Sequence, residues 1–496
     1  MNKYLIGMDI GTSGTKSVLF DLEGNTVASC TEEYPLYQPQ NGYAEQDPED
    51  WWRAAQKSLK TITQSAIDGK IIGVGLSGQM HSLVLLDENN EVIRPAILWC
   101  DQRTADECRD IENIIGRERL IEITANPALP GFTASKLMWV KKHEPENYKK
   151  TARILLAKDY IRFKLTGEYA TEVSDASGMQ LLDINTRNWS SEVCEKLDVD
   201  INKLAKVYES PDVTGYITEE ASILTGLPTG IPVAGGAGDN AASAIGTGVY
   251  EEGSAFTTIG TSGVVFAPTS TPKIDPNGRI HTFCAAVPGT WHVMGVTQAA
   301  GLSLNWFRSN FASDVTYPEI DKKCAEIPIG SDRLVYLPYL MGERTPILDS
   351  DARGVFFGLS ALHTKYHLAR AVIEGVSYSL YSCLEVLTEI GINTNDMALC
   401  GGGGKSKFWR QMLSDIYETD IKIMESSEGA ALGVAILAGC ASGEFASVEE
   451  GCSRMVRTKD KVSPDISANK QYLKVYEIYK SIYPSLKDAF AELKSI

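Results

Sequence analysis

The pentapeptide IGTSG occurs twice in this chain, at residues 10–14 and again at residues 259–263. Apolar, β-forming residues flank both copies, and the second copy begins half a chain length after the first in a sequence of 496 residues. A match in the flanks as well as in the spacing favours an internal repeat over chance. The sequence therefore predicts two halves of one architecture that face a shared cleft, each with a glycine-rich hairpin that points into it.

The first copy forms the tip of a predicted β-hairpin over residues 5–21. Gly11 and Gly14 let the backbone lie close to a bound group, and Lys16 adds a positive charge. Asp9 ends a buried strand, where an ionised carboxylate is favoured by a cation such as Mg²⁺. A tight hairpin with a capping aspartate explains the same stretch without any ligand. The hydroxyl groups at the tip, which suit phosphate oxygens, are those of Thr12, Ser13 and Thr15.

The length exceeds what one hydrophobic core usually supports, so we expect two domains, residues 1–246 and 247–496. The net charge is −17 without any basic block, which argues against nucleic acid or an anionic membrane as a partner. The ten cysteines are scattered without a CxxC pair and indicate reduced thiols in a cytoplasmic protein. We expect neither a signal peptide nor a membrane span, because no long uncharged apolar segment occurs.

A second glycine-rich stretch, residues 231–242, leads a short strand into the start of a small-residue helix. Asp239 stands at that start, where the helix dipole stabilises the carboxylate anion. It can act as a base that takes the proton of a substrate hydroxyl as the oxygen attacks phosphorus, and a simple helix cap is the other interpretation. Gly236, Gly238 and Ala241 also satisfy a weak dinucleotide fingerprint. We reject it because no Asp or Glu lies about 20 residues further on.

Two further strand ends carry polar and aromatic groups. One strand, at residues 71–76, runs into Gln79, Met80 and His81, and an apolar run at residues 96–98 is followed by Trp99 and Asp101. The ends of strands are common ligand-contacting positions in α/β folds. A structural histidine and a capped helix that begins at residue 101 or 104 account for the same residues without a ligand.

The glycine run at residues 401–404 lies between a predicted strand and a helix at residues 405–417. GGGGKS fails as a P-loop because Leu399 stands where that motif requires glycine. A glycine turn before a helix remains, which lets an adenosine lie on bare backbone. Residues 429–439 are predicted to form a second helix and the other wall of that pocket. The charged turn at residues 342–346 is interpreted as a rim salt bridge or as a lid over the cleft.

Together these stretches resemble the FGGY family of carbohydrate kinases over essentially the whole chain. The motifs that carry the resemblance are MDIGTSGTKSVLFD, EQDPEDWW, LSGQMHSLVLLD, PAILWCDQR, AGGAGDNAA, TIGTSGVVF, YLMGERTP, GVFFGL and GGGGKSKFWRQMLSDI. The resemblance implies an α/β fold of two ribonuclease H-like domains, of the actin/Hsp70/hexokinase superfamily, with ATP and sugar in a central cleft.

The resemblance also implies a role for each candidate residue. Asp239 would be the catalytic base, and Asp9 together with Asp239 would hold Mg²⁺. The sugar would be contacted by Gln79, Met80, His81, Trp99, Asp101 and Asn240. The γ-phosphate of ATP would be bound by Gly11, Thr12, Ser13, Thr15 and Lys16. The β-phosphate side would be bound by Gly260, Thr261 and Ser262, and the adenosine by Gly401, Gly402 and Gly403.

The stretch from Gln79 to His81 differs from glycerol kinases, which carry Arg-Glu there, and favours a ketopentose as acceptor. The expected reaction is transfer from ATP to the 5-hydroxyl of D-xylulose, which gives D-xylulose 5-phosphate and ADP. Ser82 departs from this pattern, since many family members that act on xylulose have glycine there. The alternatives are another acceptor (gluconate, ribulose or another polyol) and, less favoured, an actin-like or Hsp70-like ATPase module. The expected partners are the sugar and ATP, and a homodimer is left open.

Overall fold

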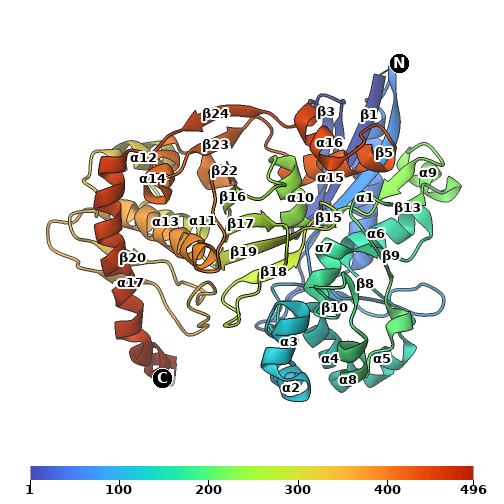
Figure 1. Cartoon of the computed structure of the whole chain (residues 1–496), viewed down its shortest axis with the longest axis horizontal. Helices are drawn as coiled ribbons and strands as arrows, with labels where there is room; N and C mark the ends of the chain where they lie inside the picture. Colours follow the sequence, from blue (N-terminus) through green and yellow to red (C-terminus); the bar gives the residue numbers. More distant parts are fainter. Residues whose placement is uncertain (1, 495–496) are drawn as a thin grey trace.

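The computed structural model describes residues 2–494 and contains two lobes, each built around a seven-stranded sheet (Figure 1). In the first sheet the strand order is β13-β14-β5-β1-β2-β3, with β15 paired to β5. Its strands are β1 (Asn2–Ile10), β2 (Gly14–Phe20), β3 (Thr26–Glu33), β5 (Gly69–Gly78), β13 (Val213–Tyr216), β14 (Pro232–Ala234) and β15 (Ala237–Gly238).

In the second sheet the order is β18-β19-β17-β16-β22-β23-β24. Its strands are β16 (Ser254–Ile259), β17 (Gly263–Thr269), β18 (His281–Cys284), β19 (Trp291–Thr297), β22 (Asp396–Cys400), β23 (Ile421–Met424) and β24 (Thr458–Val462). Small two-stranded sheets flank the two large ones, among them β20 (Val335–Leu337) with β21 (Val355–Phe357).

Both large sheets follow one plan, which confirms the prediction of two similar halves. β1 pairs antiparallel with β2 and parallel with β5, and β16 pairs antiparallel with β17 and parallel with β22. The next strands outward, β14 and β23, are parallel as well, and β13 and β24 close each sheet antiparallel. The two IGTSG segments are therefore the tips of equivalent hairpins, β1–β2 and β16–β17.

Helices cover both sheets. In the first lobe α1 (Pro48–Thr63) begins after its N-cap residue Asp47 and packs against β2 and β3. In the second lobe α13 (Lys365–Glu389) packs against β17 and β19, and α17 (Ile466–Lys494) runs along the outside (Figure 1). The other helices that bear on the site are α4 (Thr133–His143), α6 (Ala157–Thr166), α10 (Asp239–Gly246), α11 (Gly301–Phe311), α12 (Tyr317–Ala325), α14 (Lys407–Tyr417) and α15 (Gly429–Ala441).

Helix α15 corrects one prediction. It packs against β1, β5 and α10 of the first lobe, and none of its residues lines a pocket beside the glycine turn. Glycines permit this close approach, because a Cβ added to Gly75 of β5 would lie 1.8 Å from the carbonyl oxygen of Val434. A Cβ on Gly433 would lie 1.9 Å from the carbonyl oxygen of Ala242 in α10. The small residues thus signal close packing, as expected, but against the N-terminal sheet.

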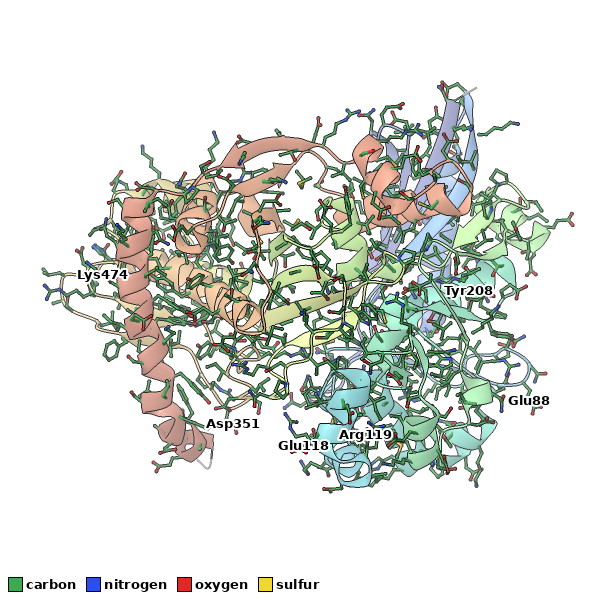
Figure 2. The ribbon with its side chains drawn as sticks, viewed as in Figure 1. Glu88, Glu118, Arg119, Tyr208, Asp351 and Lys474 are labelled. Carbon is green, nitrogen blue, oxygen red and sulfur yellow. The ribbon has the colours of Figure 1, made fainter. Side chains whose placement is uncertain are left out.

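Charged side chains such as those of Glu88, Glu118 and Lys474 lie at the periphery of the molecule (Figure 2). All ten cysteines are free thiols, and six of them are buried. Among the helices of residues 2–494, none combines the length and the apolar character that crossing a bilayer requires.

Substitution of Gly433 by alanine should destabilise the fold. Its methyl group would meet backbone atoms of α10, which cannot swing aside, so we expect the free energy of unfolding to fall by ~1–3 kcal/mol. Gly429→Ala in the same helix is the matched control, because its Cβ would find the nearest atoms of Ser243 at 3.9 Å. Denaturant unfolding of both variants checks this, and equal effects would contradict the packing described for α15.

Candidate active site

Three strands of the first sheet end side by side at one edge. The register places Asp9 of β1 opposite Ser77 of β5, and Ser77 opposite Ala237 of β15. Helix α10 follows β15 directly, with Asp239 as its first residue. Two carboxylates from distant parts of the sequence, those of Asp9 and Asp239, therefore lie at the same end of the first sheet.

The burial of the Asp9 carboxylate is energetically unfavourable for its ionised form. Its Oδ1 atom is buried and has no hydrogen-bond partner among the described residues. Burial raises the pKa of Asp9, and the neighbouring Ser77 side chain and the charge of Lys16 oppose that rise. A buried carboxylate oxygen without a donor is well suited to a cation ligand.

Asp239 behaves differently from the prediction that the helix dipole stabilises its anion. Burial, followed by the charge of Asp9, raises the pKa of Asp239 to about 7. Hydrogen bonds from the backbone N–H (2.7 Å) and Nδ2 (3.0 Å) of Asn240 to Oδ1 act in the opposite direction. The helix start is correct, but burial and a second carboxylate outweigh the dipole.

The tip of the β1–β2 hairpin is formed by Gly11, Thr12 and the exposed Ser13. The Thr12 hydroxyl accepts a hydrogen bond from Trp99 Nε1 (3.0 Å) and its carbonyl oxygen accepts one from Gln46 Nε2 (2.7 Å). Lys16 pairs with Glu428, with 2.5 Å between Nζ and Oε2, so its charge is shared with the segment that precedes α15.

A cavity of ≈ 250 Å³ opens beside Asp239 and receives residues from both lobes. The N-terminal lobe contributes Met80, His81, Trp99, Leu129, Gly131, Phe132, Asp239 and Asn240. The C-terminal lobe contributes Thr258, Gly260, Ser262, Val264, Met294, Val296 and Arg344. Apolar walls with a few convergent polar groups are typical of a small-molecule site.

His81 is fixed in an uncommon conformation. Its φ is 68°, and its carbonyl oxygen accepts hydrogen bonds from Thr133 Oγ1 (3.0 Å) and Lys136 Nζ (2.9 Å). Its ring Nδ1 lies 2.9 Å from the Gly178 carbonyl oxygen, and burial lowers the pKa of His81 well below its ordinary value. The imidazole is therefore neutral with Nδ1 as donor, which leaves Nε2 as a hydrogen-bond acceptor.

A second cavity of ≈ 570 Å³ lies in the C-terminal lobe. Gly260 and Thr261 of the second hairpin and Gly402 and Gly403 of the glycine turn line it. Its other wall comes from α11, α12 and α14, through residues that include Leu302, Tyr317, Pro318, Asp321 and Trp409. Gly260 lines both cavities, so the second hairpin lies between them.

Comparison with known proteins shows the family to which this chain belongs. Residues 4–246 match the N-terminal domain of the FGGY family of carbohydrate kinases, and residues 255–442 match its C-terminal domain. The chain belongs to the FGGY family of carbohydrate kinases. We call the cavity beside Asp239 the acceptor cavity and the cavity between the second hairpin and the glycine turn the nucleotide cavity, after the ligands predicted there from the sequence.

The relatives of this FGGY kinase are named for two different acceptors, xylulose and gluconate. It is 40% identical to the xylulose kinase of Bacillus subtilis over 495 residues, which cover 99% of each chain. Its structure superposes on ligand-bound xylulose kinase from Lactobacillus acidophilus with a TM-score of 0.94 at 31% identity, and covers 99% of this chain and 100% of that one. Gluconate kinase from the same organism gives a TM-score of 0.95, also at 31% identity and with the same coverage.

Several predicted residues of this FGGY kinase line neither cavity. Those at the tip of the first hairpin and its strands are Asp9, Gly11, Thr12, Ser13, Thr15 and Lys16, and the others are Gln79, Asp101 and Gly401. The carboxylate of Asp101 is fully buried and is occupied by Arg103, whose Nη2 donates at 2.7 Å, and by the Ala44 backbone N–H at 2.6 Å. Gln79 supports the hairpin tip, because its Oε1 accepts a hydrogen bond from Thr12 Oγ1 (3.1 Å). Thr15 is fully buried in β2, so its hydroxyl does not reach the cleft.

The predicted residues of the second hairpin divide between the two cavities. Ser262 lines the acceptor cavity and Thr261 the nucleotide cavity, although both were predicted to have the same role. Gly401 has a φ of 83° and turns the chain, whereas Gly402 and Gly403 present their backbone to the nucleotide cavity.

Sequence reasoning missed part of the acceptor cavity. Leu129, Gly131 and Phe132 precede α4 without any motif, and Met294 and Val296 belong to an ordinary apolar strand. Arg344 was visible in the charged turn, but the sequence did not show that its side chain reaches the cavity rather than the rim.

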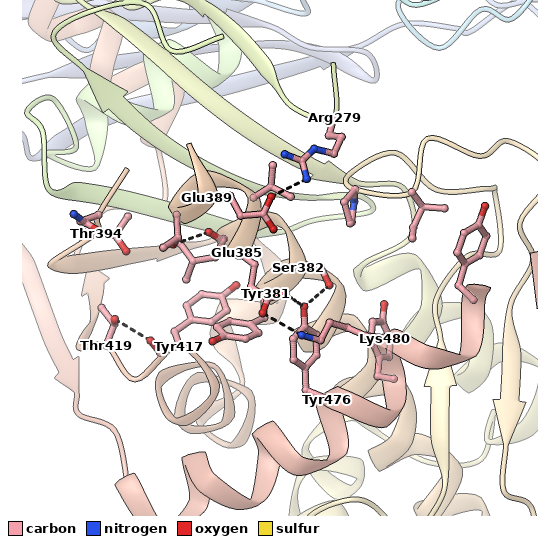
Figure 3. A pocket seen from close by; sticks show the side chains of 18 of the residues that line it. Arg279, Tyr381, Ser382, Glu385, Glu389, Thr394, Tyr417, Thr419, Tyr476 and Lys480 are labelled. Carbon is pink, nitrogen blue, oxygen red and sulfur yellow. Dashed lines mark hydrogen bonds and ion pairs between the residues drawn. The ribbon is translucent and has the colours of Figure 1, made fainter. Parts of the chain in front are cut away.

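A larger cavity of ≈ 800 Å³ lies outside the cleft, between α13 and α17 (Figure 3). Its polar groups satisfy one another: Tyr476 is hydrogen-bonded to Glu385 and to Ser382, and Arg279 Nη1 lies 2.7 Å from Glu389 Oε2 (Figure 3). None of the candidate site residues lines it. Size alone therefore does not identify the active site of this kinase.

Asp239 should make the folded protein less stable as the pH rises. Its pKa is about 7 in the folded state and 3.8 when unperturbed, so the folded state binds the proton more tightly and loses stability between these values. Asp239→Asn should therefore exceed the wild type in stability by ~1–2 kcal/mol at pH 8, and by much less at pH 4.5.

Unfolding of the ligand-free proteins at both pH values measures this difference, with the exposed Asp106→Asn as the matched control. A stability difference that does not change with pH would contradict the raised pKa of Asp239.

Proposed function

We propose that this FGGY kinase transfers the γ-phosphoryl group of ATP to the 5-hydroxyl of D-xylulose and releases D-xylulose 5-phosphate and ADP. The main support for the proposal is the composition of the acceptor cavity. Asp239 lines it together with the tip of the β16–β17 hairpin and the Met80–His81 segment. The similarity to xylulose kinases along the whole chain supports the choice of sugar.

Asp239 is the base of the proposed reaction. Its carboxylate accepts the proton of the sugar hydroxyl as the oxygen forms a bond to the γ-phosphorus, and the bond from phosphorus to the ADP oxygen breaks. A pKa of about 7 suits this task, because a general base works best when its pKa lies near the operating pH. The Asn240 amide, which donates to Asp239 Oδ1, holds the carboxylate in place.

The residues at the cleft floor fit Mg²⁺, and Asp9 and Asp239 would hold it. Asp9 Oδ1 is a buried acceptor without a donor among the described residues, and carboxylate oxygens are the ligands that Mg²⁺ prefers. No group of three or more Asp, Glu, His or Cys within residues 2–494 could hold a metal alone, so phosphate oxygens and water would complete the shell. When bound, the ion would neutralise charge on the β- and γ-phosphates.

The two hairpins have separate duties in this proposal. Gly11, Thr12 and Ser13 would receive the γ-phosphate from the N-terminal side, and Gly260 and Thr261 the β-phosphate from the C-terminal side. The adenosine would lie on Gly402 and Gly403, against the wall formed by α11 and α12. Closure of the two lobes would exclude water from the reaction and so limit ATP hydrolysis.

Gluconate is the competing acceptor within the family. A cluster of basic side chains at the acceptor cavity would favour its carboxylate, but among the residues that the structure describes Arg344 is the one cationic side chain that lines it. Lys136 lies close by and is fully buried. Its Nζ donates hydrogen bonds to the carbonyl oxygens of His81 (2.9 Å) and Gly131 (2.7 Å). The lining therefore lacks the basic cluster that would favour gluconate over a neutral ketopentose. Membership of the FGGY family removes the actin-like or Hsp70-like module from the alternatives.

A panel of acceptors tests the proposal by ADP release in a coupled assay. D-Xylulose should give the highest kcat/KM among D-xylulose, D-ribulose, D-gluconate and glycerol. Asp239→Ala should lose about 10²–10⁴-fold in kcat, because it lacks the base, and should still bind ATP. The exposed Asp106→Ala serves as control. Preference for D-gluconate would overturn the sugar assignment, and full turnover by Asp239→Ala would overturn the assignment of the base.

A further inference from the structure

The loop between β20 and β21 places Arg344 at the acceptor cavity. The backbone N–H of Thr345 donates to the Val296 carbonyl oxygen (3.0 Å), and the Val296 N–H donates to Thr345 Oγ1 (3.1 Å). The loop is thus joined to β19, whose residues Met294 and Val296 line the cavity. Arg344 belongs to this fixed part of the loop.

Glu343 fixes the backbone of Arg344 further. One of its buried carboxylate oxygens, Oε1, accepts hydrogen bonds from the backbone N–H groups of Gln298 (2.9 Å) and Arg344 (2.8 Å). The other, Oε2, accepts hydrogen bonds from Thr297 Oγ1 (2.6 Å) and Ser379 Oγ (3.1 Å). The carboxylate of Glu343 is thereby committed to the C-terminal lobe, and the neighbouring guanidinium is directed into the cleft.

The guanidinium of Arg344 reaches the opposite lobe. Its Nη2 atom lies 3.7 Å from the position that a Cβ would occupy on Gly131, which lines the same cavity. Within residues 2–494 no side chain or carbonyl group accepts a hydrogen bond or ion pair from this guanidinium. Burial lowers the pKa of Arg344, and the Glu343 charge opposes that effect. A half-buried cation without an acceptor marks a place for ligand oxygens.

The position of Arg344 shows which end of a ligand it meets. Its Nη2 atom lies beside Gly131, and the next residue, Phe132, packs edge-on against His81 with 4.9 Å between the ring centroids, so the guanidinium lies toward the His81 side of the cavity. Asp239 lies at the start of α10, beside the ends of β1 and β5. The cavity therefore has a transfer end at Asp239 and a remote end at His81, Phe132 and Arg344.

We propose that Arg344 recognises the end of the acceptor remote from the hydroxyl that is phosphorylated. Its guanidinium donates hydrogen bonds to the C1 hydroxyl and C2 carbonyl oxygens of the ketopentose, and pairs with the carboxylate of a five-carbon aldonate in the same place. The inference rests on the proposed function, since it takes the hydroxyl at Asp239 as the one phosphorylated. Because Arg344 and His81 belong to different lobes, a bound acceptor links the lobes and favours their closure.

Kinetics with D-xylulose and inhibition by D-xylonate test this role in wild type, Arg344→Met and Arg344→Lys. Arg344→Met should raise KM for D-xylulose about 10–100-fold and leave KM for ATP unchanged, because hydrogen bonds to a charged group are lost. D-Xylonate should compete with D-xylulose in the wild type, lose affinity most in Arg344→Met, and regain part of it in Arg344→Lys, which keeps the charge. Arg353→Met is the matched control, an exposed arginine whose Nη1 donates only to nearby carbonyl groups.

Several results would overturn the inference. Arg344→Met with a lower kcat but unchanged affinity for D-xylulose and D-xylonate would place the guanidinium at the transfer end. Failure of D-xylonate to bind the wild type would overturn it as well. If Arg344→Met does not fold, Arg344→Gln replaces it in the experiment. Equal affinity of D-xylonate for the wild type and Arg344→Gln would then overturn the inference.

Loss of the proposed function is distinguishable from loss of this inference. A wild type that does not phosphorylate D-xylulose contradicts the proposed function alone. Calorimetric titration of D-xylonate in the presence of ADP then still tests Arg344, because it needs no turnover. Equal affinity of D-xylonate for wild type and Arg344→Met would overturn the inference in either case.

Discussion

The repulsion between Asp9 and Asp239 in a buried cleft is the constraint on which the rest of this structure depends. The ends of β1, β5 and β15 and the start of α10 bring both carboxylates to one point, and burial raises the pKa of each. Such a site is unfavourable in the empty protein, and the cation and phosphate-bearing substrate that we propose would relieve it. Rigid packing of α15 on β1 and β5 keeps the strand ends in place despite this cost.

Much of this arrangement could be predicted from the sequence, because local patterns determine it. The repeated IGTSG segments predicted equivalent hairpins, and the register of β1–β2 and β16–β17 confirms them. Strand-to-glycine transitions likewise placed Met80, His81 and Asp239 at one edge. The direction of the Asp239 pKa shift was wrong, since the sequence shows the helix start but not the burial or the proximity of Asp9.

Other features depend on contacts between distant segments. Asp101 was predicted to contact the sugar, but Arg103, only two residues further along the chain, is hydrogen-bonded to its carboxylate. The small residues of α15 indicated close packing without naming the partner, which is the N-terminal sheet. Arg344 lay in an evident charged turn, but its path across the cleft to Gly131 follows from the attachment of that turn to β19. The identity of the acceptor also depends on such contacts, because a xylulose kinase and a gluconate kinase are almost equally similar to this structure.

The most direct test of the central claim is the pH dependence of kcat/KM for D-xylulose in the wild type, measured at MgATP concentrations far below saturation so that the free enzyme is the reference state. A base with a pKa of about 7 in the free enzyme predicts that kcat/KM rises with pH through an inflection near pH 7 and then levels off. A kcat/KM that stays constant down to about pH 5, as an unperturbed aspartate would allow, would contradict the account.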